Sequence, residues 1–185
     1  MGGLMAGKVI WHISMSLDGF IAGPNDSMDW VFERESEPSP EADEVIAATG
    51  AILGGRRWWD AAEAKYNGLD GIYGGGWVGP VFVLTHRKAE SQNPRLVFTS
   101  KPVTEAVALA LEAAKGKDVV ILGANVAQQA ISAGLLDEIL VHIVPVLLGD
   151  GVRLIEKRSV EKTNLETMSV TRSGQMTDIR LRVLK

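Results

Sequence analysis

The most informative absence is cysteine, which does not occur in this chain of 185 residues. Without thiols the chain can form no disulfide, use no thiolate nucleophile and build no cysteine-ligated zinc site of the nucleobase deaminase kind. Histidine is scarce as well, and the three histidines show no paired spacing of the zinc-binding type. We therefore expect no metal. The lack of cysteine also fits the reducing environment of the cytoplasm.

The chain has neither a surplus of basic residues nor a long apolar segment. It carries 19 Lys and Arg against 23 Asp and Glu, so it lacks the positive surface that nucleic-acid binding requires. The apolar run 139–148 is interrupted by His142 and Pro145, and the opening residues lack the charged and apolar regions of a secretory signal. We expect no nucleic-acid partner, no membrane partner and a cytoplasmic location.

The pattern of the chain is typical of an α/β domain. Short apolar runs rich in Val and Ile alternate with segments at helical spacing, and glycines separate them. The length fits one domain, residues 1–185, with 1–7 as a disordered N-terminal extension. Strands are predicted at 8–16, 51–53, 81–84, 95–98, 118–122 and 137–144. Helices are predicted at 39–50, just after 54–59, and at 103–115 and 124–133.

The last part of the chain predicts a different kind of strand pairing. Residues 165–184 contain two strands joined at 172–175, with Ile179, Leu181 and Val183 on one face. An antiparallel hairpin added to helix-linked parallel strands makes a mixed, mostly parallel sheet. Two other stretches, 17–26 and 67–79, are rich in turn-forming residues; we expect a long loop over a site and a flexible excursion, respectively.

Three predicted strand ends carry residues that suit a dinucleotide. The turn at Gly123 points backbone N–H groups and a positive helix end at one place, although a plain strand-to-helix turn explains it equally well. Gly55-Arg56-Arg57 and Thr85-His86-Arg87 add permissive backbone, hydrogen-bond donors and three guanidinium groups. Each arginine alone is better explained as a solvated surface residue. Taken together, the three arginines give these strand ends a positive charge, which favours NADPH, with its added phosphate, over NADH as cofactor.

These motifs carry a family resemblance that runs in order from about Lys8 to the C-terminus. The chain resembles the C-terminal reductase domain of the riboflavin-biosynthesis deaminase-reductase and, more distantly, dihydrofolate reductase. The matching segments are Ser16-Leu17-Asp18-Gly19-Phe20-Ile21-Ala22, Gly55-Arg56-Arg57, Leu84-Thr85-His86-Arg87, Ala133-Gly134-Leu135-Leu136-Asp137-Glu138 and Val144-Pro145-Val146-Leu147-Leu148-Gly149. The block 123–149 is the most specific of them.

The resemblance implies a dihydrofolate-reductase-like three-layer fold, a homodimer and an NADPH lying across the strand ends. It implies that the 2'-phosphate side is surrounded by Arg56, Arg57, Thr85, His86 and Arg87. The pyrophosphate would lie at Gly123, Ala124, Asn125 and Val126, and the nicotinamide and substrate would be approached by Ile21, Ala22 and Trp30. Asp18 and Gly19 would shape the loop over the reacting atoms.

Two positions depart from the family patterns. Trp58 stands where dihydrofolate reductases carry a phosphate-binding threonine, and Ile121 stands where the riboflavin reductase has a substrate-binding glutamate. The segment 56–66 also lacks the aspartate, proline and arginine pattern that grips the ribose phosphate in the riboflavin reductase. These departures bear on the identity of the substrate.

Reduction of a C=N bond also needs a proton donor, for which we choose Asp29. The neighbouring Trp30 could exclude water and raise the pKa of the carboxyl group. Asp18, Glu33 and Glu35 are alternatives, with Glu33 also beside the substrate, and an exposed Asp29 without a catalytic role is the simpler explanation. His12 and His142 lie inside predicted strands, so we expect structural roles for them.

The sequence therefore predicts an NADPH-dependent reductase of a small heterocyclic or imine-like substrate. The nearest family activity is reduction of 5-amino-6-(5-phosphoribosylamino)uracil. Dihydrofolate or another small molecule is the alternative substrate, and a nucleotide-binding protein of the same fold without turnover is a second class. A third class is an assembly module whose terminal hairpin pairs strand edges.

Overall fold

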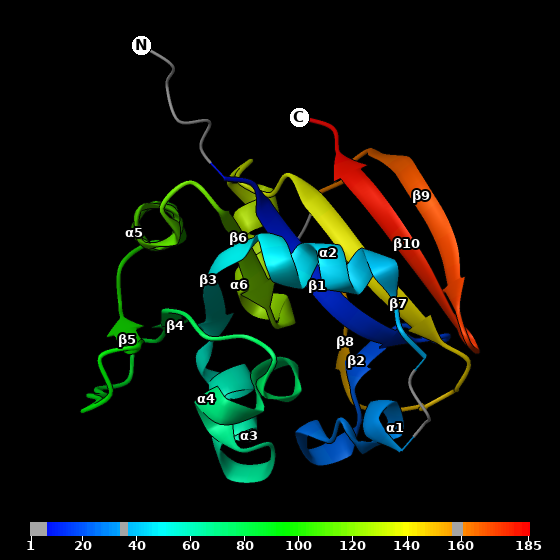
Figure 1. Cartoon of the computed structure of the whole chain (residues 1–185), viewed down its shortest axis with the longest axis horizontal. Coiled ribbons are helices and arrows are strands. Elements are labelled where there is room, and N and C mark those ends of the chain that lie inside the picture. Colours follow the sequence, from blue (N-terminus) through cyan, green and yellow to red (C-terminus); the bar gives the residue numbers. More distant parts are fainter. Residues whose placement is uncertain (1–6, 34–36, 157–160) are drawn as a thin grey trace.

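An eight-stranded mixed sheet forms the middle layer of the protein (Figure 1). The computed structural model describes residues 7–33, 37–156 and 161–185. In spatial order the strands are β5 (Leu96–Thr99), β4 (Val81–Leu84), β3 (Thr49–Gly55), β6 (Asp118–Leu122), β1 (Val9–Ser16), β7 (Glu138–Val144), β10 (Met176–Val183) and β9 (Leu165–Ser173). The first six are parallel, and β10 is antiparallel to both of its neighbours, which confirms the predicted mixed sheet.

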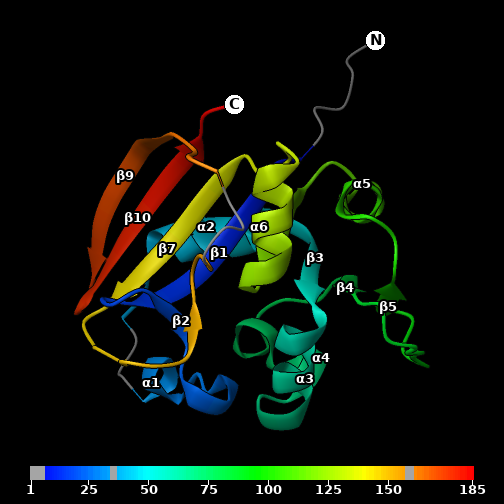
Figure 2. The ribbon, with the colours of Figure 1, turned by 180° about the vertical axis from the view of Figure 1, so that it is seen from behind.

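Helices cover both faces of this sheet. Figure 1 shows α2 (Pro40–Ala48) across the front, and Figure 2 shows α6 (Ala124–Ser132) along the opposite face. The helix α5 (Val103–Ala114) shares a core with α6, whereas α3 (Arg56–Lys65) shares a second core with α2. The remaining short elements are α1 (Asp29–Phe32), α4 (Gly68–Gly71), and the 3₁₀ turns η1 (Pro24–Asp26) and η2 (Ile72–Gly75).

Alternation along the strands divides the apolar side chains between these two cores. Trp11 on β1 and Ile121 on β6 face α5 and α6, while Ile10 and Val120 face α2 and α3. All four are fully buried, as expected for parallel strands covered on both sides. This arrangement is the predicted three-layer fold. No helix in the described part of the chain has the length and apolar character to cross a bilayer.

The C-terminal hairpin confirms the predicted strand pairing. β9 and β10 are joined at Gly174, whose φ of +60° is left-handed. Ile179, Leu181 and Val183 pack against the core shared with α5 and α6. The described residues do not include 1–6, on which most of the predicted N-terminal extension lies.

Three local predictions are wrong. Gly50 does not end a helix: α2 ends at Ala48, and Gly50 lies in β3, where a Cβ atom would stand 2.5 Å from the Ala114 carbonyl oxygen. Its lack of a side chain lets β3 and α5 pack closely. The 67–79 segment is folded rather than a free excursion, since Ile72 and Trp77 are buried and the Trp77 indole donates to the Thr49 carbonyl at 3.0 Å.

The predicted loop at 17–26 contains regular structure as well. Its residues 20–22 form β2 (Phe20–Ala22), which pairs antiparallel with β8 (Val152–Arg153). The partner strand is two residues long and lies 130 residues later, so no local pattern reveals the pairing. The same segment ends in the turn η1. This small sheet places the loop beside the carboxyl end of β1.

Candidate functional site

The three predicted cofactor motifs meet at the carboxyl edge of the sheet. Gly54 in β3 pairs with Leu122 in β6, and Gly55 pairs with Leu84 in β4. The turns that follow these three strands are therefore neighbours. Open α/β sheets bind ligands at such an edge, outside the carboxyl ends of their strands. The structure thus brings the segments 55–57, 85–87 and 123–126 together.

Two helices begin at this edge of the sheet. α3 begins directly after Gly55 and α6 directly after Gly123, and neither helix has a side-chain cap. The first-turn N–H groups of a helix have no acceptor within the helix, and they carry the positive end of its dipole. Gly123 has φ +94°, a conformation that strongly favours glycine. Backbone donors at Ala124, Asn125 and Val126 therefore suit an anion.

Trp58 fills the space between these two turns. A Cβ atom on Gly54 would stand 2.2 Å from Cε3 of the Trp58 ring, and one on Gly123 would stand 3.2 Å from the Trp58 Cβ. The Trp58 side chain therefore lies against the glycines of both strand ends, at the position where the resemblance to dihydrofolate reductase implies a threonine. Trp59, by contrast, is buried in the core behind α3. The substitution is accommodated because both neighbouring positions lack side chains.

Asp60 joins two of the predicted phosphate-binding arginines. Its carboxylate accepts hydrogen bonds from Arg56 Nε at 2.6 Å and from Arg87 Nη2 at 2.7 Å. Burial by itself raises the pKa of Asp60, but hydrogen bonds from Arg56 and Arg87 outweigh it and keep the pKa below its ordinary value. Asp60 was not among the predicted site residues, although its i,i+4 spacing from Arg56 indicates an ion pair on a helix.

The other members of the cationic group lie around this bridge. The Arg56 guanidinium lies over the Phe98 ring at 5.4 Å, and its Nη1 is buried without a hydrogen-bond partner among the described residues. Arg57 is exposed and pairs with Asp26 at 2.7 Å. Thr85 is buried and accepts the Arg87 N–H at 3.1 Å, whereas His86, between them, is exposed.

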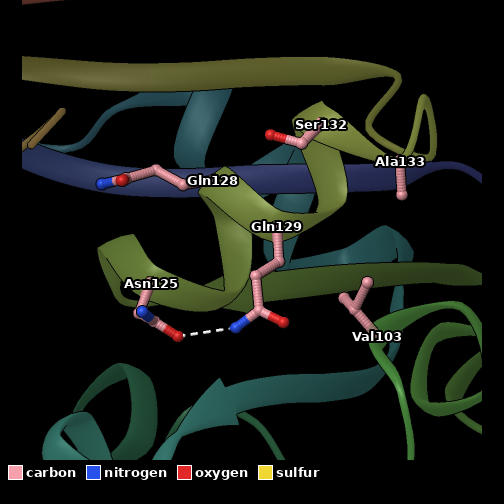
Figure 3. A pocket seen from close by; sticks show the side chains of 6 residues that line it. All are labelled: Val103, Asn125, Gln128, Gln129, Ser132 and Ala133. Carbon is pink, nitrogen blue, oxygen red and sulfur yellow. Dashed lines mark hydrogen bonds between the residues drawn. The ribbon is translucent and has the colours of Figure 1, made fainter. Parts of the chain in front are cut away.

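A shallow pocket of about 380 Å³ lies beside the helix α6. Figure 3 shows Asn125 and Gln129 joined by a hydrogen bond of 2.7 Å between successive turns, with Val103 on the facing segment. The remaining lining residues are Gln128, Ser132 and Ala133. Only Asn125 was predicted as a site residue. Nothing in the sequence indicated that the start of α5 faces this side of α6.

Asp18 joins two loops through hydrogen bonds at the end of β1. Its carboxylate accepts Ser16 Oγ at 2.6 Å and the backbone N–H groups of Leu148 and Gly149, the latter at 2.7 Å. The Ser16 hydrogen bond, together with the two backbone donors, lowers the pKa of Asp18 to about 2. A carboxylate that holds a proton this weakly is a poor proton donor near neutrality. The geometry favours a positioning role for Asp18.

The expected environment of Asp29 is wrong. Asp29 begins α1, is exposed and accepts the Tyr66 hydroxyl at 3.1 Å. The Trp30 indole donates to the Ser27 carbonyl at 3.0 Å, and the shielding of the carboxylate from water that we expected is absent. The pattern of adjacent residues could not show this, because shielding depends on segments distant in sequence.

The remaining predicted residues lie around the same loop. Ile21 is buried in the core and Ala22 is half-buried, both on β2. Glu33 follows α1 and is exposed, while Glu35 lies outside the described residues. In the part of the chain that the structure describes, no three His, Asp or Glu side chains converge in a way that could hold a metal ion.

Comparisons with known proteins agree with this architecture. Residues 7–178 match the family model of the RibD C-terminal domain. The uncharacterized YwjB protein of Bacillus subtilis (strain 168) is 24% identical over 180 residues, which cover 92% of this chain and 95% of YwjB. A solved structure from Shewanella sp. PV-4, provisionally assigned to riboflavin biosynthesis, has a TM-score of 0.74 at 20% identity, over 96% of this chain and 99% of that one.

A longer enzyme of known structure shares the fold over part of its length. It is the diaminohydroxyphosphoribosylaminopyrimidine deaminase/5-amino-6-(5-phosphoribosylamino)uracil reductase of Thermotoga maritima, with a TM-score of 0.67 at 15% identity. The match covers 97% of this chain and 57% of the Thermotoga protein. These likenesses confirm the predicted dihydrofolate-reductase-like fold.

Proposed function

The chain belongs to the RibD C-terminal domain family, and from this membership we propose that it is an NADPH-dependent reductase. The family is of the oxidoreductase type and is associated with riboflavin biosynthesis. The proposed reaction transfers hydride to a small heterocyclic or imine-like substrate. Among the candidates, the aminouracil that carries a phosphorylated sugar comes first, because the Thermotoga protein is named for its reduction.

The observation that carries the proposal is the meeting of three strand ends at one edge. Two helix N-termini and the Arg56–Asp60–Arg87 bridge lie there. Pyrophosphate needs backbone donors, and an added 2'-phosphate needs cationic side chains. Two guanidinium groups on one carboxylate leave a net positive charge of one. This is the feature that we expect to favour NADPH over NADH.

The residues present fit NADPH by an independent criterion. Arg56 Nη1 is a buried donor with no partner among the described residues, and a buried orphaned donor is costly unless a ligand supplies an acceptor. Gly55 and Gly123 add no side chain of their own at the two helix N-termini, and the Trp58 side chain lies between the turns. We propose that the pocket formed by Asn125, Gln129 and Val103 takes the adenine, since it continues from the α6 N-terminus.

We propose the following roles for the residues around the bound cofactor. Bound NADPH supplies a hydride to the substrate. Asp18 holds the loop after β1 against residues 148–149, which orients Ile21 and Ala22 beside the reacting atoms. Asp29 and Glu33 are the carboxyl groups available to deliver a proton to a substrate nitrogen, and both are accessible from solvent. The family resemblance further suggests a homodimer in the cytoplasm.

The experiment follows NADPH oxidation at 340 nm with the aminouracil substrate and, separately, with dihydrofolate. Reduced product must appear in a one-to-one ratio to the NADPH consumed, and NADPH carrying deuterium on the transferred hydride must label the product. Turnover of the aminouracil supports the proposal, and turnover of dihydrofolate alone supports the alternative substrate. NADPH binding without turnover of either substrate would favour a nucleotide-binding protein without enzymatic activity. Trp58 and Ile121, which depart from the family patterns, are the residues that favour this alternative.

A further inference from the structure

Four side chains form a continuous hydrogen-bonded chain across the α2 face of the sheet, away from the proposed cofactor edge. The Tyr73 hydroxyl lies 2.7 Å from His12 Nδ1, and His12 Nε2 lies 2.7 Å from His142 Nε2. His142 Nδ1 lies 2.6 Å from Asp178 Oδ1. The two histidines and Asp178 are buried, and Tyr73 is the half-buried residue at the other end of this series of hydrogen bonds. The Tyr73 hydroxyl faces His12, and burial raises the pKa of that hydroxyl well above its ordinary value.

Asp178 is held as an ionised acceptor at the far end. Its Oδ2 accepts the hydroxyl groups of Ser39 at 2.6 Å and of Ser173 at 2.7 Å. Burial by itself raises the pKa of Asp178, but hydrogen bonds from Ser39, His142 and Ser173 keep the pKa below its ordinary value. The carboxylate therefore offers His142 Nδ1 an acceptor and no donor.

The ionised Asp178 carboxylate fixes the direction of all three hydrogen bonds among the four side chains. His142 Nδ1 must donate to Asp178, so in neutral His142 the Nε2 atom is an acceptor. His12 then donates from Nε2, which leaves its Nδ1 as the acceptor of the Tyr73 hydroxyl. All three hydrogen bonds point toward Asp178. The two histidines are therefore required to be opposite tautomers.

We propose that Tyr73, His12, His142 and Asp178 form a proton relay that takes up one proton as a unit. A solvent proton adds to the Tyr73 oxygen as the hydroxyl proton passes to His12 Nδ1, and the His12 Nε2 proton passes to His142 Nε2. His142 becomes an imidazolium paired with Asp178. His12 ends as the neutral Nδ1–H tautomer, which donates to Tyr73. Each proton moves by one position, and the relay gains one positive charge.

The surrounding charges are compatible with this uptake. Arg180 on β10 pairs with Glu138 of β7 at 2.9 Å and with Glu44 and Glu41 of α2 at 2.9 and 3.5 Å. Glu138 also binds Lys8 at 2.7 Å. Among the described residues of this ion-pair cluster, three carboxylates thus stand against two cations, and the excess negative charge favours an added proton.

The added charge is expected to rest on His142. Burial and the neighbouring His142 lower the pKa of His12 to about 3. His142, in contrast, has the Asp178 carboxylate against its other ring nitrogen. A cation on His142 is therefore paired, whereas a cation on His12 would face the other imidazole.

Imidazole ¹⁵N NMR of the full chain, from pH 8 to pH 4, tests the relay directly. The chain has three histidines, and the exposed His86 serves as the reference for an independent titration. We expect His12 to change from Nε2–H to Nδ1–H with the same pH midpoint at which His142 becomes imidazolium. The relay is overturned if His12 keeps its tautomer while His142 titrates, if both become imidazolium, or if both stay neutral until the protein unfolds.

Replacement of the relay's outer end gives a second test. Tyr73→Phe leaves His12 Nδ1 without a donor before proton uptake and leaves its Nδ1–H without an acceptor afterwards. A buried unpaired N–H group is the less tolerated of the two, so the shared midpoint is expected to fall by up to about one pH unit, a tenfold weaker proton affinity. Tyr66→Phe is the matched control, because Tyr66 is the other tyrosine and binds Met28 and Asp29 instead. Equal midpoints in the two variants would contradict the role given to Tyr73.

Discussion

Replacing Gly54 by alanine tests the position of Trp58 between the turns that follow β3 and β6. An added Cβ would lie 2.2, 2.6 and 3.0 Å from three atoms of the Trp58 ring. Contacts under 3.0 Å cannot persist, so the indole must shift out of the space above the strand ends. Gly54 is not among the glycines with left-handed backbone, and alanine therefore meets no conformational barrier. The cost of the substitution comes from the ring alone.

Overpacking of this kind costs about 1 to 3 kcal/mol of unfolding free energy. For a protein of this size each kcal/mol lowers Tm by about 2 to 4 °C, so the expected loss is about 2 to 12 °C. In a Trp58→Thr background the ring is gone, and alanine at position 54 is expected to cost almost nothing. The coupling free energy of the double-mutant cycle is therefore about 1 to 3 kcal/mol.

Urea denaturation followed by circular dichroism measures all four members of the cycle. Gly55→Ala is the matched control, because the nearest atom to its Cβ would be Val126 Cγ2 at 3.4 Å, an ordinary contact. That variant is expected to be neutral or up to about 1 kcal/mol more stable. An equal cost of Gly54→Ala with and without the Trp58 ring, or no cost at all, would refute this placement of the ring.

Three further predictions concern the site. Arg56→Ala is expected to weaken NADPH binding at least about tenfold in a tryptophan-fluorescence titration, because a charge-assisted hydrogen bond contributes about 1.5 to 3 kcal/mol; Arg182→Ala, which removes the same charge from β10, should leave binding unchanged. The folded-state pKa of Asp18 is about 2, so its stabilisation is complete above about pH 4 and is lost as pH falls toward 2. Asp18→Asn should therefore lower Tm at pH 7 and flatten the Tm profile between pH 4 and 2; an unchanged acid slope would contradict this. Asp29→Asn is expected to lower kcat about 10²-fold or more with KM little changed if Asp29 is the donor, and an unaltered kcat would exclude it.

The regular elements could be predicted because each carries its own periodicity. The buried strands around Ile121 and the α5 stripe of Val103 and Val107 are local patterns, and they need no knowledge of distant segments. Gly50 shows the limit of this reasoning. Its backbone is an ordinary strand, and the reason for glycine is the approach of Ala114, which lies 64 positions later in the sequence.

The candidate site was partly predictable for a related reason. Parallel strands bring their carboxyl ends to one edge, so residues that follow such strands, like Gly55, Arg87 and Gly123, meet wherever the strands are correctly identified. The exposure of Asp29 and the bridge from Asp60 to Arg87 depend instead on how α1 and α3 lie relative to other segments. The pairing of His12 with His142 likewise arises from adjacent strands whose histidines are 130 residues apart.

We propose that the edge formed by β3, β4 and β6 binds NADPH through its phosphates. The most direct measurement is a calorimetric titration of the purified protein with NADPH and with NADH under identical salt. We predict NADPH binding at least about tenfold tighter, because the added phosphate meets the Arg56 and Arg87 guanidinium groups. Equal affinity for both nucleotides, or binding of neither, would contradict the account.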